Sequence, residues 1–199
     1  MKHVHDRSVR IIGGARKGKK LLSVAGLSTR PLMRRVKQSL FDILSKRIIG
    51  ASFLDLYAGI GSVGIEAISR GAARVVFVEA DPGCIKVINS NLSICSFKEK
   101  AEVVKSDILE WARKGAGLIA REKFDIVFAG PPFKLNLICT TLETINRLKL
   151  VKINGWIICQ HHVGEKVPEV YQEAPFSMFR QEKYGKTMLS FYRHEEKKQ

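Results

Sequence analysis

The chain has 199 residues, 45% of them hydrophobic, which fits one domain able to bury its own core. It carries 34 Lys and Arg against 19 Asp and Glu, a formal net charge of +15 that favours a polyanionic partner. The sequence shows no signal-peptide pattern, no membrane-length apolar run and no C-x-x-C pair, so we expect a cytoplasmic monomer with reduced thiols and no zinc site.

The positive charge is concentrated at the start of the chain. Residues 1–50 hold 13 basic and 2 acidic side chains, whereas residues 51–150 hold 13 and 11. Such clustering predicts a docking surface for phosphates, although surplus Lys that only aids solubility remains an alternative. We therefore divide the chain into a basic extension at 1–50, a main domain at 51–194 and a polar tail at 195–199.

Two features are predicted within the basic extension. The Gly- and Lys-rich stretch at 10–20 is expected to be too flexible and too charged for the core, and to become ordered only on nucleic acid. Apolar residues at helical spacing over 33–49 predict an amphipathic helix, which carries Arg34, Arg35 and Lys37 along one edge of its first turns.

From Ser52 onward, short β-branched or aromatic runs alternate with helical stretches, which is typical of βα units around a parallel sheet. Strands are predicted at 53–57, 74–79, 101–105, 124–129 and 156–161, and helices at 63–70, 82–94, from 107, and at 135–148. Two further strands at 176–182 and 187–193 flank a Tyr184-Gly185 turn. The expected fold is therefore α/β and Rossmann-like, with a mostly parallel sheet and a C-terminal antiparallel hairpin.

A glycine-rich turn follows the first strand of this domain. Gly59, Gly61 and Gly64 have the G-x-G-x-x-G spacing of loops that bind adenosyl cofactors. The same spacing occurs in NAD and FAD proteins, so a nicotinamide-dependent oxidoreductase stays open as an alternative. Asp55 favours S-adenosylmethionine, because a carboxylate beside the turn repels a pyrophosphate and attracts the ammonium of a methionine moiety.

Acidic residues also follow the next two strands. Glu79 ends the second strand, where a carboxylate can accept protons from ribose hydroxyls, and Asp107 follows the third, within reach of an adenine amine. Each acid alone is equally well explained as a helix cap or a solvated loop residue, but acids at successive strand ends favour a ligand site. The expected cofactor contacts are Asp55, Tyr57, Gly59, Gly61, Gly64, Glu79, Asp107 and Ile108.

The run Phe128-Ala-Gly-Pro-Pro-Phe133 follows the fourth strand. It resembles the reaction loop of amine methyltransferases, in which Asp or Asn precedes Pro-Pro and then Tyr or Phe. Together with the motifs at 10–14, 30–31, 35–41 and 184–187, it makes the chain similar, nearly end to end, to the RsmD family of bacterial 16S rRNA guanine-N2 methyltransferases. The resemblance implies S-adenosylmethionine as cofactor and 16S rRNA or the small ribosomal subunit as partner.

The resemblance also implies roles for the loop Gly130, Pro131, Pro132 and Phe133. An exocyclic amine is a weak nucleophile because its lone pair is delocalised, so acceptors must hold its protons. The Pro131 carbonyl is expected to be one acceptor, and Phe133 to stack on a base turned out of its helix. The second acceptor position is Gly130, which has no side chain, and such a loss costs on the order of a hundredfold in rate.

Three interpretations of Gly130 remain open. The protein works with Pro131 and a water or a neighbouring acid, it is a slow enzyme, or it binds cofactor and RNA without turnover. The last of these is a binding protein rather than an enzyme, and turnover by the purified protein would eliminate it.

The predicted RNA contacts all precede residue 50. Arg30, Arg34, Arg35 and Lys37 are expected to bind phosphates beside the reactive base, because several cations in a helix's first turns oppose its dipole and indicate an outside anion. For any single one of them, solvated charge at the start of a helix is the better explanation. A mobile basic arm is expected from Arg16, Lys17, Lys19 and Lys20, and Arg10 completes the set. His161, His162, Trp111 and Trp156 are expected to be structural.

Overall fold

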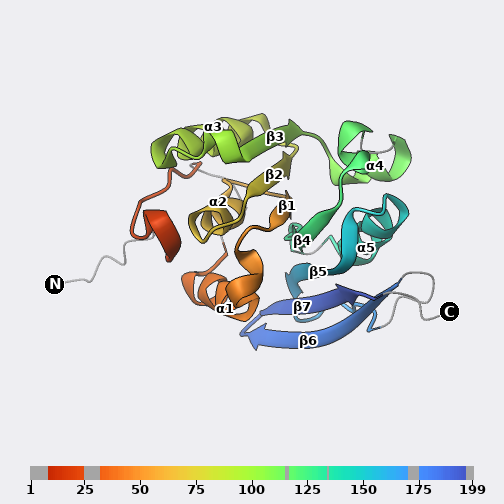
Figure 1. The fold of residues 1–199 in the computed structure, drawn as a ribbon. Helices are drawn as coiled ribbons and strands as arrows, with labels where there is room; N and C mark the ends of the chain where they lie inside the picture. Colours follow the sequence, from red (N-terminus) through yellow and green to blue (C-terminus); the bar gives the residue numbers. More distant parts are fainter. Residues whose placement is uncertain (1–8, 25–31, 115–116, 134, 170–174, 196–199) are drawn as a thin grey trace.

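The computed structural model describes residues 9–24, 32–114, 117–133, 135–169 and 175–195. Over these residues a single seven-stranded sheet has the strand order β3-β2-β1-β4-β5-β7-β6 (Figure 1). The strands are β1 (Ser52–Leu56), β2 (Arg74–Glu79), β3 (Ala101–Lys105), β4 (Phe124–Ala129), β5 (Val151–His162), β6 (Phe176–Tyr184) and β7 (Thr187–His194). The first five are parallel, whereas β7 pairs antiparallel with both β5 and β6. The predicted fold class is confirmed.

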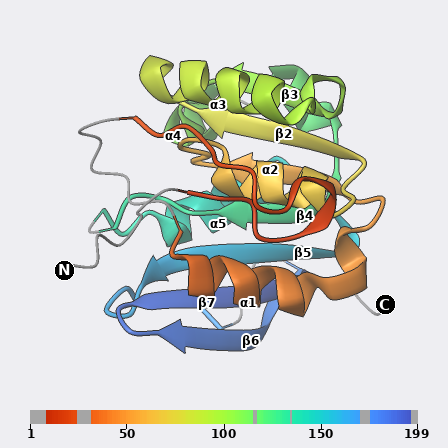
Figure 2. The same cartoon turned by 90° about the vertical axis from the view of Figure 1, so that its left-hand side faces the viewer.

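Helices cover both faces of the sheet. They are α1 (Arg34–Leu44), α2 (Ser62–Ser69), α3 (Pro82–Cys95), α4 (Ile108–Lys114) and α5 (Ile138–Arg147). Figures 1 and 2 show α1, α2 and α3 on one face and α4 and α5 on the other. Each face has its own apolar cluster, so the central strands are buried on both sides and read as continuous apolar runs such as Val75–Val78.

The strand order reverses between β1 and β4, which both leave the sheet toward the same edge. In open α/β sheets, ligands bind at this reversal, outside the carboxyl ends of the strands. The fold therefore brings together the loops that follow β1, β2, β3 and β4, where the sequence places the glycine turn, the acidic residues and the Gly-Pro-Pro-Phe motif.

Some boundaries differ from prediction, and β5 shows the reason. The strand begins at Val151 rather than 156 and runs through Asn154-Gly155, which the sequence suggested as a turn. Asn154 has a φ of 62°, and the pairing with β4 shifts register at this point. A Cβ on Gly155 would lie 3.1 Å from the Asp125 carbonyl oxygen and 2.8 Å from that of Lys152. The Gly thus forms a bulge within the strand rather than ending it.

The N-terminal segment packs onto the domain instead of extending from it. Ile11 and Leu21 are 1% and 2% exposed and belong to the same apolar cluster as α1 and α2. An isolated antiparallel bridge joins Arg10 to Lys20, and Figure 2 shows this segment lying across α2 between α1 and α3. The expectation that the stretch at 10–20 orders only on nucleic acid is wrong, because Ile11 and Leu21 anchor the loop at its two ends.

No helix among the described residues combines the length and the apolar character needed to cross a membrane.

Candidate cofactor and RNA site

The glycine turn after β1 is shaped by its three glycines in different ways. Gly59 and Gly61 have φ values of 58° and 77°, in the left-handed region that side chains disfavour. A Cβ on Gly59 would meet nothing within 4 Å, so the backbone there faces open space. Gly64 has no such space, because a Cβ would lie 2.3 Å from the Phe77 ring. The absence of a side chain at Gly64 therefore lets α2 pack directly on β2.

Asp55 lies beneath the turn and holds it in place. Its side chain is 1% exposed, and Oδ2 accepts a hydrogen bond from the Gly64 N–H at 2.8 Å. Burial raises the pKa of Asp55 to about 8, opposed by the Gly64 hydrogen bond and reinforced by the charge of Glu79. This corrects the expectation that Asp55 faces a ligand's ammonium group. The carboxyl acts on the loop, because α2 closes over it.

Glu79, at the end of β2, is half-buried and points at the same turn. One carboxylate oxygen accepts the Gly59 N–H at 2.7 Å, and the other accepts the N–H groups of Ala80 and Asp81, both at 2.9 Å. A carboxylate can accept about four hydrogen bonds, so one further position is left for a ribose hydroxyl. The sequence placed Glu79 correctly at the end of the second strand, but it did not indicate that Glu79 holds Gly59.

The residues that follow β3 have structural roles of their own. Asp107 Oδ1 accepts the Leu109 N–H at 2.8 Å at the start of α4, which is the helix-cap alternative that the sequence left open. Ile108 is 2% exposed and lies in the apolar cluster, so its side chain packs in the core rather than facing a ligand. Both residues lie at the expected strand end.

Tyr57 leaves β1 with a φ of 60°, which turns the chain into the glycine loop. Its hydroxyl pairs with Thr141 Oγ1 of α5 at 2.9 Å. Burial raises the pKa of Tyr57 to about 12, against the effect of the Thr141 hydrogen bond. The phenol is therefore uncharged, and it lies between the glycine turn and α5.

The Gly-Pro-Pro-Phe loop is attached to this turn through the backbone. The Gly130 N–H donates to the Leu56 carbonyl at 3.3 Å, joining the end of β4 to the end of β1. Pro131 is buried, Pro132 is exposed and Phe133 is half-buried. The Phe133 ring lies edge-on to His162, with ring centroids 6.1 Å apart. The structure thus brings the predicted reaction loop beside the predicted cofactor turn.

The two histidines at the end of β5 differ in exposure. His161 is 2% exposed and bonds to Ser190 Oγ and the His162 carbonyl oxygen, at 2.8 and 3.0 Å. Burial lowers the pKa of His161, which favours its neutral form. His162 is half-buried beside Phe133. Trp111 and Trp156 are buried, as expected. Within the described ranges, no group of three or more His, Cys, Asp or Glu side chains is arranged to hold a metal ion.

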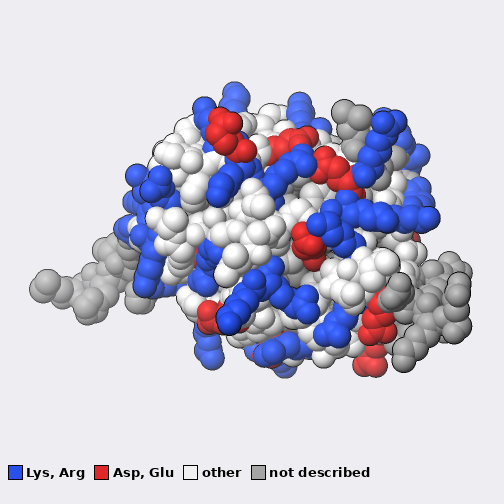
Figure 3. Space-filling view, in the orientation of Figure 1, with Lys and Arg blue, Asp and Glu red and all other residues white. Residues whose placement is uncertain are grey.

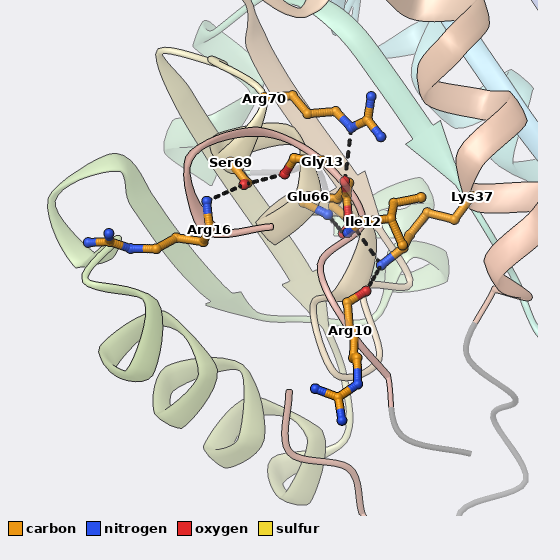
Figure 4. A network of polar contacts seen from close by, with 10 residues as sticks. Arg10, Ile12, Gly13, Arg16, Lys37, Glu66, Ser69 and Arg70 are labelled. Atoms are coloured by element: carbon orange, nitrogen blue, oxygen red, sulfur yellow. Dashed lines mark hydrogen bonds and ion pairs between the residues drawn. The ribbon is translucent and has the colours of Figure 1, made fainter. Parts of the chain in front are cut away.

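Among the basic residues at the start of the chain, Lys37 is buried, whereas most of the others are exposed. Lys37 is 2% exposed and forms an ion pair with Glu66 at 3.2 Å, while its Nζ donates to the Arg10 carbonyl oxygen at 2.9 Å (Figure 4). Its assignment as a phosphate contact is therefore wrong, because helix α1 turns it toward α2. Burial lowers the pKa of Lys37, and the partner Glu66 opposes that effect.

The predicted mobile arm is an ordered loop. The Arg16 N–H donates to Ser69 Oγ at 3.0 Å (Figure 4). Arg16 Nε donates to the Cys95 carbonyl oxygen at 2.9 Å. A Cβ on Gly14 would lie 1.7 Å from the Ser69 carbonyl oxygen, so the glycine permits the close approach. The neighbouring cations are exposed on this loop and still form a basic surface: Lys17, Lys19 and Lys20. Arg30 lies outside the described residues.

A second basic surface lies between α1 and β6. Arg34 and Arg35 line an open groove of about 1080 Å³, opposite Arg180 and Tyr184. We call it the α1–β6 groove, and Figure 3 shows Lys and Arg gathered in this region. Its other lining residues are Gln38, Ser39, Asp42 and Ile43. Tyr184 and Ser39 are joined by a hydrogen bond between their hydroxyls.

Strand register places this groove near the reaction loop. His162 pairs with Thr187, which pairs with Tyr184, so the three residues lie side by side on one face of the sheet. Adjacent strands are about 4.8 Å apart, so Tyr184 is about 10 Å from His162, the residue that contacts Phe133. The groove therefore lies on the same face of the sheet as His162, next to the reaction loop.

Sequence reasoning missed the contribution of β6 to this surface. Arg180 is 46% exposed and pairs with Glu182, and nothing in its local pattern distinguishes it from other charged strand residues. Tyr184 belongs to a motif shared with the family that the chain resembles, which was a usable signal. The contact between α1 and β6 spans more than 140 residues of sequence and depends on the sheet order.

Comparison with known proteins places these features in context. The family model described as conserved hypothetical protein 95 matches residues 9–193. Ribosomal RNA small subunit methyltransferase D of Escherichia coli (strain K12) is 33% identical over 200 residues, covering 97% of this chain and 93% of that protein.

Solved structures give the same picture. The structure of Escherichia coli yhhF matches with a TM-score of 0.81 and 32% identity, over 94% of this chain and 98% of that one. An RNA methyltransferase from Salinibacter ruber, solved with S-adenosyl-L-homocysteine, matches with a TM-score of 0.62 over 85% and 96% of the two chains. At 15% identity, that second match shows a shared fold.

Proposed function

Because this chain belongs to the RsmD family of ribosomal RNA small subunit methyltransferases, we propose that it transfers a methyl group from S-adenosylmethionine to the N2 amine of a guanine in 16S rRNA. The reaction takes place in the cytosol, on the small ribosomal subunit or its RNA, and the protein acts as a monomer. Family membership favours this function over the nicotinamide-dependent oxidoreductase that the glycine spacing alone left open.

One observation carries the proposal. The Gly130 N–H bonds to the Leu56 carbonyl, so an amine-type reaction loop stands directly beside the glycine turn at the reversal of strand order. A methyl donor in the turn and a base at the loop are thereby brought within reach of each other. Transfer needs no covalent enzyme intermediate, because the amine nitrogen attacks the methyl carbon in line.

The residues around the turn fit an adenosyl cofactor. The backbone at Gly59 faces open space, and a positive φ there keeps side chains away from a ligand. Glu79 retains one acceptor position for a ribose hydroxyl, and Asp107 lies at the neighbouring strand end, where an adenine amine is expected. When bound, the cofactor supplies an electrophilic methyl group on a sulfonium sulfur.

The loop residues position the base. The Pro131 carbonyl accepts a hydrogen bond from one N–H of the amine, Pro132 stiffens the loop, and Phe133 stacks on the guanine after it has left its helix. His162 supports the Phe133 ring from its edge. The surplus proton of the methylated amine leaves to water, so no dedicated base is required.

The basic surfaces hold the RNA backbone. Arg34, Arg35 and Arg180 in the α1–β6 groove contact the phosphates near the reactive base, and the loop carrying Lys17 and Lys19 contacts a more distant part of the RNA. Phosphate contacts fix the orientation of the RNA, and the reaction loop selects the base.

The test is transfer of labelled methyl from S-adenosylmethionine to small-subunit particles that lack this modification, and to their naked RNA, with the modified base mapped. Incorporation at one guanine N2 is the expected result. A label on another base, or on large-subunit RNA, would refute the proposed substrate. Cofactor binding without any incorporation would favour the alternative motivated by Gly130, a protein that binds cofactor and RNA without turnover.

A further inference from the structure

The reaction loop lacks a side-chain acceptor at Gly130, and a side chain from a neighbouring strand fills the space. A Cβ placed on Gly130 would lie 3.3 Å from Oε1 of Gln160 and 3.1 Å from Cε1 of Phe128. The amide oxygen of Gln160 therefore lies where a side chain of residue 130 would project. An acceptor group is present at this point of the loop, although it belongs to a different residue.

Strand register explains this arrangement. Strands β4 and β5 are parallel, with Phe128 opposite Ile158 and Ala129 opposite Cys159. The next positions are Gly130 and Gln160, and since side chains alternate between faces, both point to the face of Phe128 and Ile158. That face carries α1 and the α1–β6 groove. Gln160 is thus directed toward the side from which the RNA arrives.

The carboxamide of Gln160 is not engaged elsewhere. Gln160 is half-buried, and among the described residues its side chain makes no hydrogen bond. By contrast, the next residue, His161, bonds through both ring nitrogens. A half-buried amide without a partner is free to accept a hydrogen bond from a ligand that enters the loop.

We propose that Gln160 is a catalytic residue that accepts one N–H of the substrate amine, replacing the acceptor that Gly130 lacks. The inference rests on the proposed function and names a new residue for it. With Pro131 holding the other N–H, the nitrogen lone pair is directed at the methyl group. The new N–C bond forms as the C–S bond breaks, the bond electrons remain on sulfur, and the surplus proton leaves to water. Gln160 orients the amine and keeps its own protons.

The first experiment compares methyl transfer by the wild-type protein, Gln160→Ala and Gln160→Met. The Met variant keeps the volume of the side chain but removes the amide, so it separates a lost acceptor from a cavity. We expect both to lower kcat/KM by on the order of a hundredfold, with affinity for S-adenosylhomocysteine unchanged. The matched control is Gln181→Ala, because Gln181 lies on β6 in the same sheet and bonds to Ser190 on the other face. It should retain wild-type activity.

The second experiment is rescue. Gly130→Asn in the Gln160→Ala background restores an amide acceptor from the loop itself. The φ of Gly130 lies outside the positive region, and removing Gln160 leaves only the 3.1 Å contact with Phe128 to relax. We expect the double variant to be more active than Gln160→Ala alone. A side chain that acts only through packing would not be replaced in this way.

The third experiment measures the hydrogen bond without turnover. A synthetic RNA containing the mapped guanine is compared with the same RNA carrying inosine, which lacks the 2-amino group. Wild-type protein should prefer the guanine RNA, because its amine donates to both Pro131 and Gln160. Gln160→Ala should reduce that preference by about fivefold, as the loss of one hydrogen bond predicts.

These outcomes separate the inference from the function on which it rests. Wild-type activity in both Gln160 variants, or a guanine preference unchanged by them, would overturn the role of Gln160 alone. Absence of transfer by the wild-type protein on every RNA, with cofactor binding intact, would overturn the proposed function and this inference together.

Discussion

The ammonium of Lys37 lies 3.2 Å from the carboxylate of Glu66, and both side chains are buried, at 2% and 0% exposed. Glu66 also accepts the Ile12 N–H and the Arg70 Nε–H, each at 2.9 Å (Figure 4). Lys37 in turn holds the Arg10 carbonyl. One buried charge group thus joins α1, α2 and the N-terminal segment.

Glu66→Gln is expected to destabilise the protein by about 3–5 kcal/mol, because it leaves the buried Lys37 without its counter-charge. Urea unfolding measures the loss, and trypsin should cleave faster within residues 9–24. The control is Glu102→Gln, which breaks an ion pair with Arg74 that is 44% and 46% exposed and should cost about 1 kcal/mol or less. Equal losses in the two variants would contradict the importance of burial.

The stability of the cofactor-free protein should fall as pH rises toward 8. Burial raises the pKa of Asp55 to about 8, above the value near 3.9 expected when unfolded, so the folded state retains a proton that the unfolded state releases. The contribution of Asp55 is complete below about pH 4 and declines by at most about 1.4 kcal/mol per pH unit up to its folded pKa.

Asp55→Asn removes this titration while keeping an acceptor for the Gly64 N–H. The free energy of unfolding, measured between about pH 5.5 and about pH 8, should therefore change less in the variant than in the wild-type protein. Parallel slopes for the two proteins would show that Asp55 does not retain its proton.

Gly64→Ala should destabilise the protein by about 1–3 kcal/mol and weaken cofactor binding, because a Cβ would lie 2.3 Å from the Phe77 ring and push α2 away from β2. Thermal unfolding and S-adenosylhomocysteine titration measure the two effects. Gly164→Ala is the control, since its Cβ would lie 3.3 Å from a His162 ring atom and outside the turn. Unchanged cofactor affinity in Gly64→Ala would argue against a ligand at the turn.

Charge reversal in the α1–β6 groove should weaken RNA binding and reduce its salt dependence. For Arg34→Glu with Arg35→Glu, each lost phosphate contact lowers the slope of log K against log salt by about 0.7–0.9. Lys98→Glu with Lys100→Glu is the matched control, because these exposed lysines lie next to β3, at the opposite edge of the sheet from β6. Filter binding at several salt concentrations should show a much smaller change in the control. Similar changes in both pairs would indicate that only total charge matters.

Phe133→Leu should lower kcat/KM for RNA, because stacking of a base on an aromatic ring contributes about 1–3 kcal/mol. Phe133→Tyr keeps the ring and should retain most of the activity. Affinity for S-adenosylhomocysteine should be the same in both, since the ring contacts His162 rather than the glycine turn. A Leu variant as active as the Tyr variant would exclude base stacking at this position.

Much of the fold could be predicted from local patterns. Strands β2 and β4 begin and end where their β-branched and aromatic runs do, because burial on both faces leaves continuous apolar sequences. Strand β3 also has its predicted bounds, although it lies at the edge of the sheet and none of its residues is fully buried. Helix α3 begins at Pro82 after an Asp81 cap that accepts the Cys84 N–H at 2.7 Å. Helix α5 begins at Ile138, three residues later than predicted. There the Ile138 N–H bonds to Glu165, a distant residue that no local pattern indicates.

By itself, the sequence determined the class of the fold, the glycine turn, the acids at successive strand ends and the loop at 130–133, because each depends on residues close together in the chain. Only the tertiary structure decided how these groups are used. Lys37 follows two solvent-exposed arginines along the chain, yet it is buried because α1 packs on α2 and places it against Glu66. Gln160 reaches Gly130 only because β4 and β5 pair in one register. Burial and contact between distant residues depend on packing, which local patterns do not contain.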